Sequence, residues 1–417
     1  MPSPAPHVRN LRLALVRTIA DVPATAWDAL VDPNDPFLEH AFLLALEQSG
    51  STGKASGWIP AYLVAHEETP GGADQEAFES VVGAVPLFLK LHSYGEFVFD
   101  WGWAGSAERA GIPYYPKLVA AAPLTPVTGR RLLVHADRDA AAIEEALIGG
   151  LRWAADQLGA SSVHVLFCTE AEQRQLASAG YSARMGMQFH WENRADKPYA
   201  DFDDFLSAFR SRNRKQVRQE RTRAAGHGLR LATRAGSELT DTEWRALEMF
   251  YEANIEKHDG ARYLTPAFFV EMRKHLAHRV VATFAYDGDR PVAGTLNFER
   301  GRHIYGRYWG ATDEREMLHF ELCYYALIDR AVQRGYTRFE AGAQGEHKLK
   351  RGLDPAPTYS AHWIRHPGLA AAVDRFVTSE SVAIHNEIAR YKELSPYART
   401  APATGSSAPS TSRNDEP

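Results

Sequence analysis

The segment GAQGEHKLKRG, in the last quarter of the chain, groups side chains that can carry out acid–base chemistry. Glu346 and His347 are two candidate bases, and the amide of Gln344 can orient a polar substrate group. Transfer to an amine requires that the amine lose a proton and that donors stabilise the developing oxyanion. Lys348 and Arg351 could hold an anionic substrate group. The segment therefore indicates a reactive loop, although the same residues also suit an ordinary polar turn.

Five side chains from other segments could join this loop. Glu321 and Tyr324 lie three residues apart on a predicted helix, so they share a face and are candidate catalytic residues. Trp309 and His362, on predicted strands, and His319, at the start of the helix, could bind substrate. The alternatives are a helix-stabilising acid and ordinary core or structural residues. The spacing of these His and Glu residues matches no zinc pattern, so we predict no metal site.

A basic segment provides the clearest charge signal. Residues 210–234 contain nine Lys or Arg and one acid, Glu220, in a chain with a net charge of −5. The spacing predicts a helix, and Arg suits phosphate because its planar fork donates two parallel hydrogen bonds. The residues that we expect to bind phosphate are Arg210, Arg214, Lys215 and Arg218. The alternative is a solvated helix face.

Two aromatic segments that each contain a Trp-Gly pair are predicted as equivalent strands, FVFDWGWAG and IYGRYWGA. Alternation in the second places Tyr305, Arg307 and Trp309 on one face and Tyr308 on the other. The first is followed by Lys117. These aromatic residues and Lys117 could form a cleft that binds a sugar or a peptide in the first half.

The elements that must position these residues occur twice along the chain. Each half contains a pair of strands, a helix stopped by glycine (140–159 and 319–335), a strand, and a last strand carrying His-Trp. This order predicts a divergent duplication, and two unrelated α/β halves are the alternative. The predicted units are two domains over residues 10–192 and 193–395 and a Pro/Ser/Thr-rich disordered tail over 396–417.

Length and composition agree with two globular domains. The chain has 417 residues, of which 45% are hydrophobic and 24% are charged. Two cysteines and the absence of an apolar leader or of a run of about 18 apolar residues favour a cytoplasmic protein without a membrane span. No GxSxG, Walker A, HExxH or dinucleotide fingerprint is present, which disfavours those hydrolases, P-loop NTPases and Rossmann dehydrogenases.

Several strings resemble the FemAB-like family, and the element order resembles the GNAT acyltransferase fold. The strings are PFLEHAFLLALEQSGS, YYPKLVAAAPLTPVTGRRLL, SRNRKQVRQER, HFELCYYALIDRA, GAQGEHKLKRG and SAHW. The resemblance implies an α/β (α+β) chain of two tandem GNAT-like domains, each a mixed, mostly antiparallel sheet flanked by helices. The expected activity is transfer of an acyl or aminoacyl group onto an amine, for example on a cell-envelope precursor.

The same resemblance bears on the co-substrate. It implies acyl-CoA or aminoacyl-tRNA, with no tightly bound cofactor, and a phosphorylated or nucleotide-linked substrate as partner. The string WGATDEREMLHFE stands where acetyl-CoA enzymes carry an Arg/Gln-x-x-Gly-x-Gly/Ala turn, and it lacks that glycine spacing. An aminoacyl-tRNA donor would tolerate this departure. The alternative is a binding protein without turnover that holds a phosphorylated ligand or RNA in the same groove.

Overall fold

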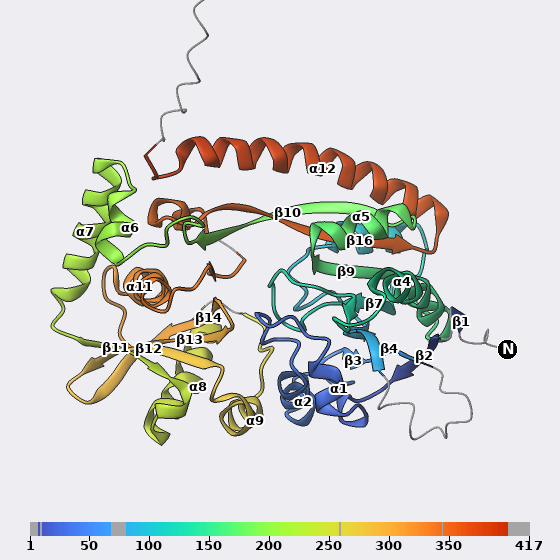
Figure 1. Cartoon of the computed structure of the whole chain (residues 1–417), viewed down its shortest axis with the longest axis horizontal. Coiled ribbons are helices and arrows are strands. Elements are labelled where there is room, and N and C mark those ends of the chain that lie inside the picture. The colour runs from blue at the N-terminus through green and yellow to red at the C-terminus, as the bar shows by residue number, and fades with distance from the viewer. Residues whose placement is uncertain (1–6, 9–10, 68–80, 258–259, 344, 399–417) are drawn as a thin grey trace, which may run out of the picture.

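Helices and strands alternate along both halves of the computed structural model (Figure 1). It describes residues 7–8, 11–67, 81–257, 260–343 and 345–398. The first half contains β1 (His7–Val8), β2 (Leu11–Val16), α1 (Ala24–Asp28), α2 (His40–Gln48), β3 (Trp58–Pro60), β4 (Tyr62–Glu67), β5 (Val81–Val85), β6 (Leu87–Lys90), α3 (Trp101–Arg109), β7 (Lys117–Ala120), β8 (Leu133–Val134), α4 (Ala140–Gln157), β9 (Ser162–Cys168), α5 (Glu170–Ser178) and β10 (Ser182–Glu192).

The second half repeats this alternation with longer strands. It contains α6 (Phe202–Ser207), α7 (Ser211–Ala225), β11 (Arg230–Ala235), α8 (Asp241–Lys257), α9 (Pro266–Leu276), β12 (Val280–Asp287), β13 (Arg290–Arg300), β14 (His303–Ala311), α10 (Leu318–Phe320), the π-helix η4 (Glu321–Tyr325), α11 (Ala326–Gln333), β15 (Arg338–Glu340), the 3-10 helix η5 (Glu346–Arg351), β16 (Asp354–Ile364) and α12 (Pro367–Leu394). Short 3-10 helices at Ile19–Asp21 and Gly236–Glu238 complete the described elements.

The strands form two sheets whose topology confirms the predicted α/β fold with two GNAT-like halves. A five-stranded sheet has the order β1-β2-β4-β5-β8, and an eleven-stranded sheet has the order β11-β12-β13-β14-β15-β10-β16-β9-β7-β6-β3. Most neighbours are antiparallel, but β7 and β9, and likewise β14 and β15, are parallel. A helical crossover connects each parallel pair, α4 in the first half and α10–η4–α11 in the second.

The last strands of the two halves cross over and join the halves into one sheet. β10 pairs with β16 from Ser182↔His362 to His190↔Asp354. β10 also pairs with β15 of the second half, and β16 with β9 of the first half. In Figure 1, α12 runs along this central pair. Residues after position 353 thus complete the sheet of the first half.

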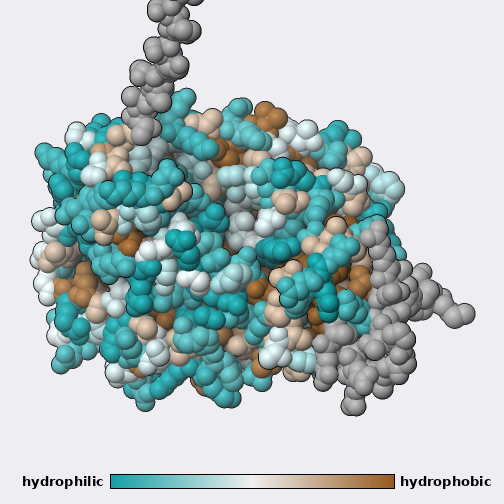
Figure 2. All heavy atoms as spheres, in the orientation of Figure 1, coloured by the Kyte–Doolittle hydropathy of each residue, from teal (hydrophilic) through white to brown (hydrophobic). Residues whose placement is uncertain are grey.

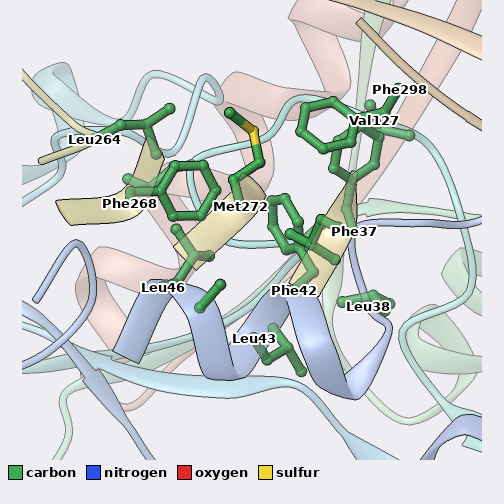
Figure 3. Close-up of a cluster of buried hydrophobic side chains, with 14 of the residues drawn as sticks. Phe37, Leu38, Phe42, Leu43, Leu46, Val127, Leu264, Phe268, Met272 and Phe298 are labelled. Atoms are coloured by element: carbon green, nitrogen blue, oxygen red, sulfur yellow. The ribbon is translucent and has the colours of Figure 1, made fainter. Parts of the chain in front are cut away.

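An apolar core lies where the halves meet. Phe37 and Phe42, from the α2 region, make edge contacts with Phe298 of β13, and Phe42 also contacts Phe268 of α9. Figure 3 shows these rings packed around Met272. All five side chains are buried, with at most 4% of their surface exposed. Because these apolar side chains come from both halves, the hydrophobic effect holds the halves together.

Two segments differ from the sequence-based expectation. FVFDWGWAG is not a strand, because Trp101 begins helix α3. At the other end, Tyr397 forms a bridge with Phe209 and donates a hydrogen bond to the Gly352 carbonyl at 2.8 Å. Residues 396–398 are therefore ordered, whereas the remainder of the predicted tail lies outside the described residues.

The surface in Figure 2 is mainly hydrophilic, with hydrophobic residues scattered over it. None of the helices in the described part of the chain combines the length and apolar character needed to cross a bilayer.

Candidate active site

The reactive loop predicted from the sequence meets the π-helix. Tyr324 Oη lies 2.9 Å from His347 Nε2, so the two side chains share a hydrogen bond. Tyr324 belongs to η4, and π-turns inside helices are frequent at functional sites. His347 follows Gly345, whose φ of +113° disfavours a side chain, and a Cβ there would lie 2.5 Å from the His347 ring. The glycine therefore permits the close approach.

Four of the predicted site residues come together around this bond. The His319 ring lies 5.2 Å from Trp309, 5.6 Å from Tyr324 and 6.1 Å from His347, between ring centroids. Burial, reinforced by His347 and nearby cations, lowers the pKa of His319 to about 4. Partial burial and the charge of Arg351 also lower the pKa of His347, while burial raises that of Tyr324. All three side chains are therefore neutral at pH 7.

The two predicted anion-binding residues of the loop turn inward. Lys348 Nζ donates to the Gly342 carbonyl at 2.7 Å, and burial lowers its pKa to about 8. Arg351 pairs with Glu220 at 2.9 Å and donates to the His347 carbonyl at 2.6 Å. Arg351 thus fixes the loop that carries His347.

Residues 211–225 of the basic segment form α7, whose inner face contacts the loop, and the segment ends in β11. Glu220 pairs with Arg351 and accepts a hydrogen bond from Tyr325 of η4. Arg221 binds both carboxylate oxygens of Glu321, and burial raises the pKa of that carboxyl. Glu321 is therefore held in an ion pair. Glu220 and Arg221 were not predicted as site residues from the sequence, although a single acid in a basic helix was a usable signal.

The four predicted phosphate-binding residues lie elsewhere on this segment. Arg218 pairs with exposed Asp203 at 3.1 Å, and Arg214 donates to the Ser207 carbonyl at 3.3 Å. Arg210 and Lys215 are exposed. The described contacts bring none of them to the Tyr324–His347 pair, and α7 lies at the left edge of the molecule in Figure 1. Their role in phosphate binding stays a prediction.

The described contacts of Glu346 involve Tyr391 rather than the pair. Glu346 is exposed, and together with burial its carboxylate raises the pKa of Tyr391 on α12 to about 12. Gln344 lies outside the described residues.

His362 is not brought into the cluster. Because β16 crosses into the first half, this side chain is buried beside β9, with its Nδ1 2.8 Å from His164 Nδ1 and its Nε2 2.9 Å from Ser360 Oγ. The Trp103 ring packs edge-on against it. The structure thus gives His362 contacts of a buried structural residue.

The expectation that Lys117 lines an open cleft is wrong. Its ammonium is fully buried and binds Glu96 at 2.8 Å, Ser93 at 2.8 Å and Asp100. A buried cation of this kind needs such partners, and here two carboxylates supply them. The neighbouring Tyr114 hydroxyl also donates to Asp100. Lys117 is therefore occupied within the protein.

A cavity of about 210 Å³ opens between the halves next to the reactive loop. Its lining residues are Phe97, Val98, Phe99, Phe167, Arg184, Met185, Gly186, Met187, Gln188, Ala343, Thr358, Tyr359, Ser360, Glu380 and Ile384. Ala343 belongs to the loop that leads to His347. Mixed polar and apolar walls of this kind can hold an extended substrate. Within the described residues, no group of His, Cys, Asp and Glu is arranged to hold a metal ion.

Comparison with known proteins agrees with the resemblance seen in the sequence. A sequence model of a family described as peptidoglycan biosynthesis/recognition matches residues 18–399. No curated protein sequence matches the chain.

Solved structures with a similar arrangement share little sequence with this chain. FemX is 13% identical, with a TM-score of 0.49, over 85% of this chain and 98% of FemX. L-PGS from Bacillus licheniformis is 12% identical, with a TM-score of 0.46, over 83% and 98%. A tandem GNAT protein from the clavulanic acid biosynthesis pathway is 12% identical, with a TM-score of 0.41, over 86% and 99%.

Proposed function

Since the chain belongs to the FemAB-like family, we propose that it is a transferase that moves an acyl or aminoacyl group onto an amine. The observation that carries the proposal is the hydrogen bond between Tyr324 and His347. Both groups are neutral at pH 7, so one can accept a proton while the other donates one. We assign the chemistry to the second half on this basis.

In the proposed step the pair takes one proton from the amine and gives one proton to the leaving atom. The amine nitrogen attacks the acyl carbonyl, and the bond from that carbon to the leaving sulfur or oxygen breaks. His347 accepts the amine proton at Nδ1, Tyr324 gives its proton to the leaving atom, and His347 returns a proton from Nε2 to Tyr324. Atoms and charge balance without a covalent intermediate on the protein. A well-placed acid–base pair of this kind accelerates a reaction by about 10²–10⁴-fold.

The proposed substrates follow from the two faces of the second-half sheet. The ladder between β14 and β15 ends at Tyr305↔Glu340, and the residues directly beyond it are small: Gly306 on β14, and Ala341 and Gly342 after β15. The donor on one face and the amine on the other would meet where this ladder ends. We propose acyl-CoA or aminoacyl-tRNA as donor, which places the reaction in the cytoplasm, with the exposed cations of α7 holding its phosphates. We propose as acceptor an amine, for example one carried by a cell-envelope precursor.

The test is a transfer assay with paired variants. Wild-type protein is incubated with acyl-CoAs or aminoacyl-tRNAs and amine acceptors, and products are followed by mass spectrometry. Tyr324→Phe and His347→Ala should each lower the transfer rate by about 100-fold or more with the melting temperature preserved. His385→Ala, on the exposed surface of α12, is the control and should match wild type.

Two results would contradict the proposal. Variants of Tyr324 and His347 that transfer as fast as wild type would remove the pair from the chemistry. Wild-type protein that binds a phosphorylated ligand or RNA but never transfers a group would favour the binding-protein alternative.

A further inference from the structure

We propose that Arg307 binds an oxyanion, a carboxylate or a phosphate, carried by the amine substrate. This inference rests on the proposed function, because it assigns the acceptor to one side of the second-half sheet.

Arg307 is the extra residue of a β-bulge. Asn297 of β13 pairs with Gly306, and Leu296 pairs with Tyr308, so Arg307 has no partner residue on β13. A bulge redirects the local side chains and is frequent next to active sites. The sequence-based alternation is therefore wrong at this point, because Tyr308 packs with Tyr305 against the core shared by the halves.

As a result of the bulge, Arg307 and the catalytic cluster lie on opposite faces of the sheet. Trp309, two residues further on, packs with Leu318 and Leu322 on the other face and contacts His319. Arg307 instead reaches the first half, where its Nη2 donates to the Leu124 carbonyl at 2.8 Å. The ladder between β14 and β15 ends at Tyr305↔Glu340, two residues before Arg307, and the acceptor would reach the catalytic cluster at this end of the ladder.

The charge of Arg307 lacks a counter-ion within the described residues. Its partners there are neutral: the Leu124 carbonyl, the Thr125 hydroxyl at 3.4 Å, the Tyr308 hydroxyl, and the rings of Phe37 and Tyr308. Glu340 acts on Arg307 through its charge but forms no ion pair with it. Burial lowers the pKa of Arg307, yet a guanidinium stays protonated in proteins. A charge in such surroundings gains from an anion, and Arg binds planar oxyanions through two parallel hydrogen bonds.

Arg300 provides a matched comparison. It also reaches from the second half to the first, where it donates to the Asp32 carbonyl at 2.8 Å and the Asp35 carbonyl at 2.7 Å. In addition, Arg300 has a carboxylate partner, Glu39, at 3.2 Å. Arg300 therefore connects the halves with its charge neutralised by Glu39. The charge of Arg307 is left for a ligand to neutralise.

The test uses the full chain and paired probes. Binding is measured by calorimetry with alanyl-alanine and its amide, and with phosphoethanolamine and ethanolamine. Wild-type protein should bind one oxyanionic amine at least about tenfold more tightly than its neutral counterpart. Arg307→Gln should remove this preference and leave the affinity for the neutral probe unchanged, while Arg307→Lys should keep part of it. Whether the carboxylate or the phosphate probe is preferred identifies the oxyanion.

Arg300→Gln is the control for a purely structural role. It should lower the melting temperature without changing the preference for the oxyanionic probe. The inference is overturned if wild type shows no such preference or if Arg307→Gln retains it. In the transfer assay, Arg307→Gln should raise the KM for the acceptor by at least about tenfold with kcat retained. Oxyanion binding that depends on Arg307 in a protein without transfer activity would contradict the proposed function alone.

Discussion

At the scale of single residues, the contacts of each predicted side chain decide which of them can exchange protons. The sequence left Glu346 and His347 open as bases. In the structure both residues are exposed, but Glu346 lies beside Tyr391, whereas His347 bonds to Tyr324 and lies against the rings of His319 and Phe320. Because partial burial and the charge of Arg351 lower its pKa, the His347 imidazole is neutral at pH 7 and has one ring nitrogen free to accept a proton. These contacts favour His347 as the base.

The first prediction concerns the pH dependence of transfer. A base works only when unprotonated, and the usual pKa of His is about 6.5. Because the pKa of His347 is lowered, the rate should stay level as the pH falls to about 6.5 and decline only below it. Rates measured from pH 5 to 8 test this. His347→Gln should lack the acidic decline, and a wild-type midpoint above pH 6.5 would argue against His347 as the base.

At the scale of elements, α7 has two faces with different roles. Its exposed face carries most of the positive charge that made the segment conspicuous in the sequence. Its inner face presents Glu220 and Arg221 to η5 and η4, so the helix holds both segments that contribute to the Tyr324–His347 pair. We infer that α7 positions the catalytic loop whether or not it binds a ligand.

The second prediction compares two acid–Arg pairs that involve this helix. Glu220–Arg351 and Glu316–Arg223 both have a separation of 2.9 Å, but side-chain exposure is 7% and 5% in the first and 61% and 58% in the second. Glu220→Gln leaves a buried guanidinium without its counter-ion and should lower the free energy of unfolding by about 3 kcal/mol. Glu316→Gln should change it by less than about 1 kcal/mol. Chemical denaturation measures both.

The transfer assay separates positioning from stability. Glu220→Gln should lower the transfer rate at temperatures where the variant is fully folded, since Arg351 also binds the His347 carbonyl. Glu316→Gln should transfer like wild type. Equal effects of the two substitutions would show that the Glu220–Arg351 pair does not position the loop.

At the scale of the whole molecule, features set by neighbouring residues could be predicted from the sequence, but the pairing of distant strands could not. The helix stops at Gly159 and Gly335 follow from neighbouring residues, and both glycines have a positive φ just after their helices. The exchange of β10 and β16 depends on which distant strand each one meets, which alternation alone does not encode. For the same reason the sequence placed His362 near the reactive loop. The bulge at Arg307 likewise depends on the register with β13.

The last prediction follows from the strand exchange. A fragment ending at residue 192 would lack β16, which lies between β9 and β10, and the remaining fragment would lack β10, which lies between β15 and β16. Each fragment would therefore expose unpaired strand edges and half of the shared apolar core, so neither should fold alone. We expect the intact chain to unfold in one cooperative transition by calorimetry. Fragments 1–192 and 193–417 should be insoluble when expressed separately and form a folded complex when expressed together. If fragment 1–192 alone showed a cooperative thermal transition, the first half would be self-sufficient and the exchanged strand dispensable for its folding.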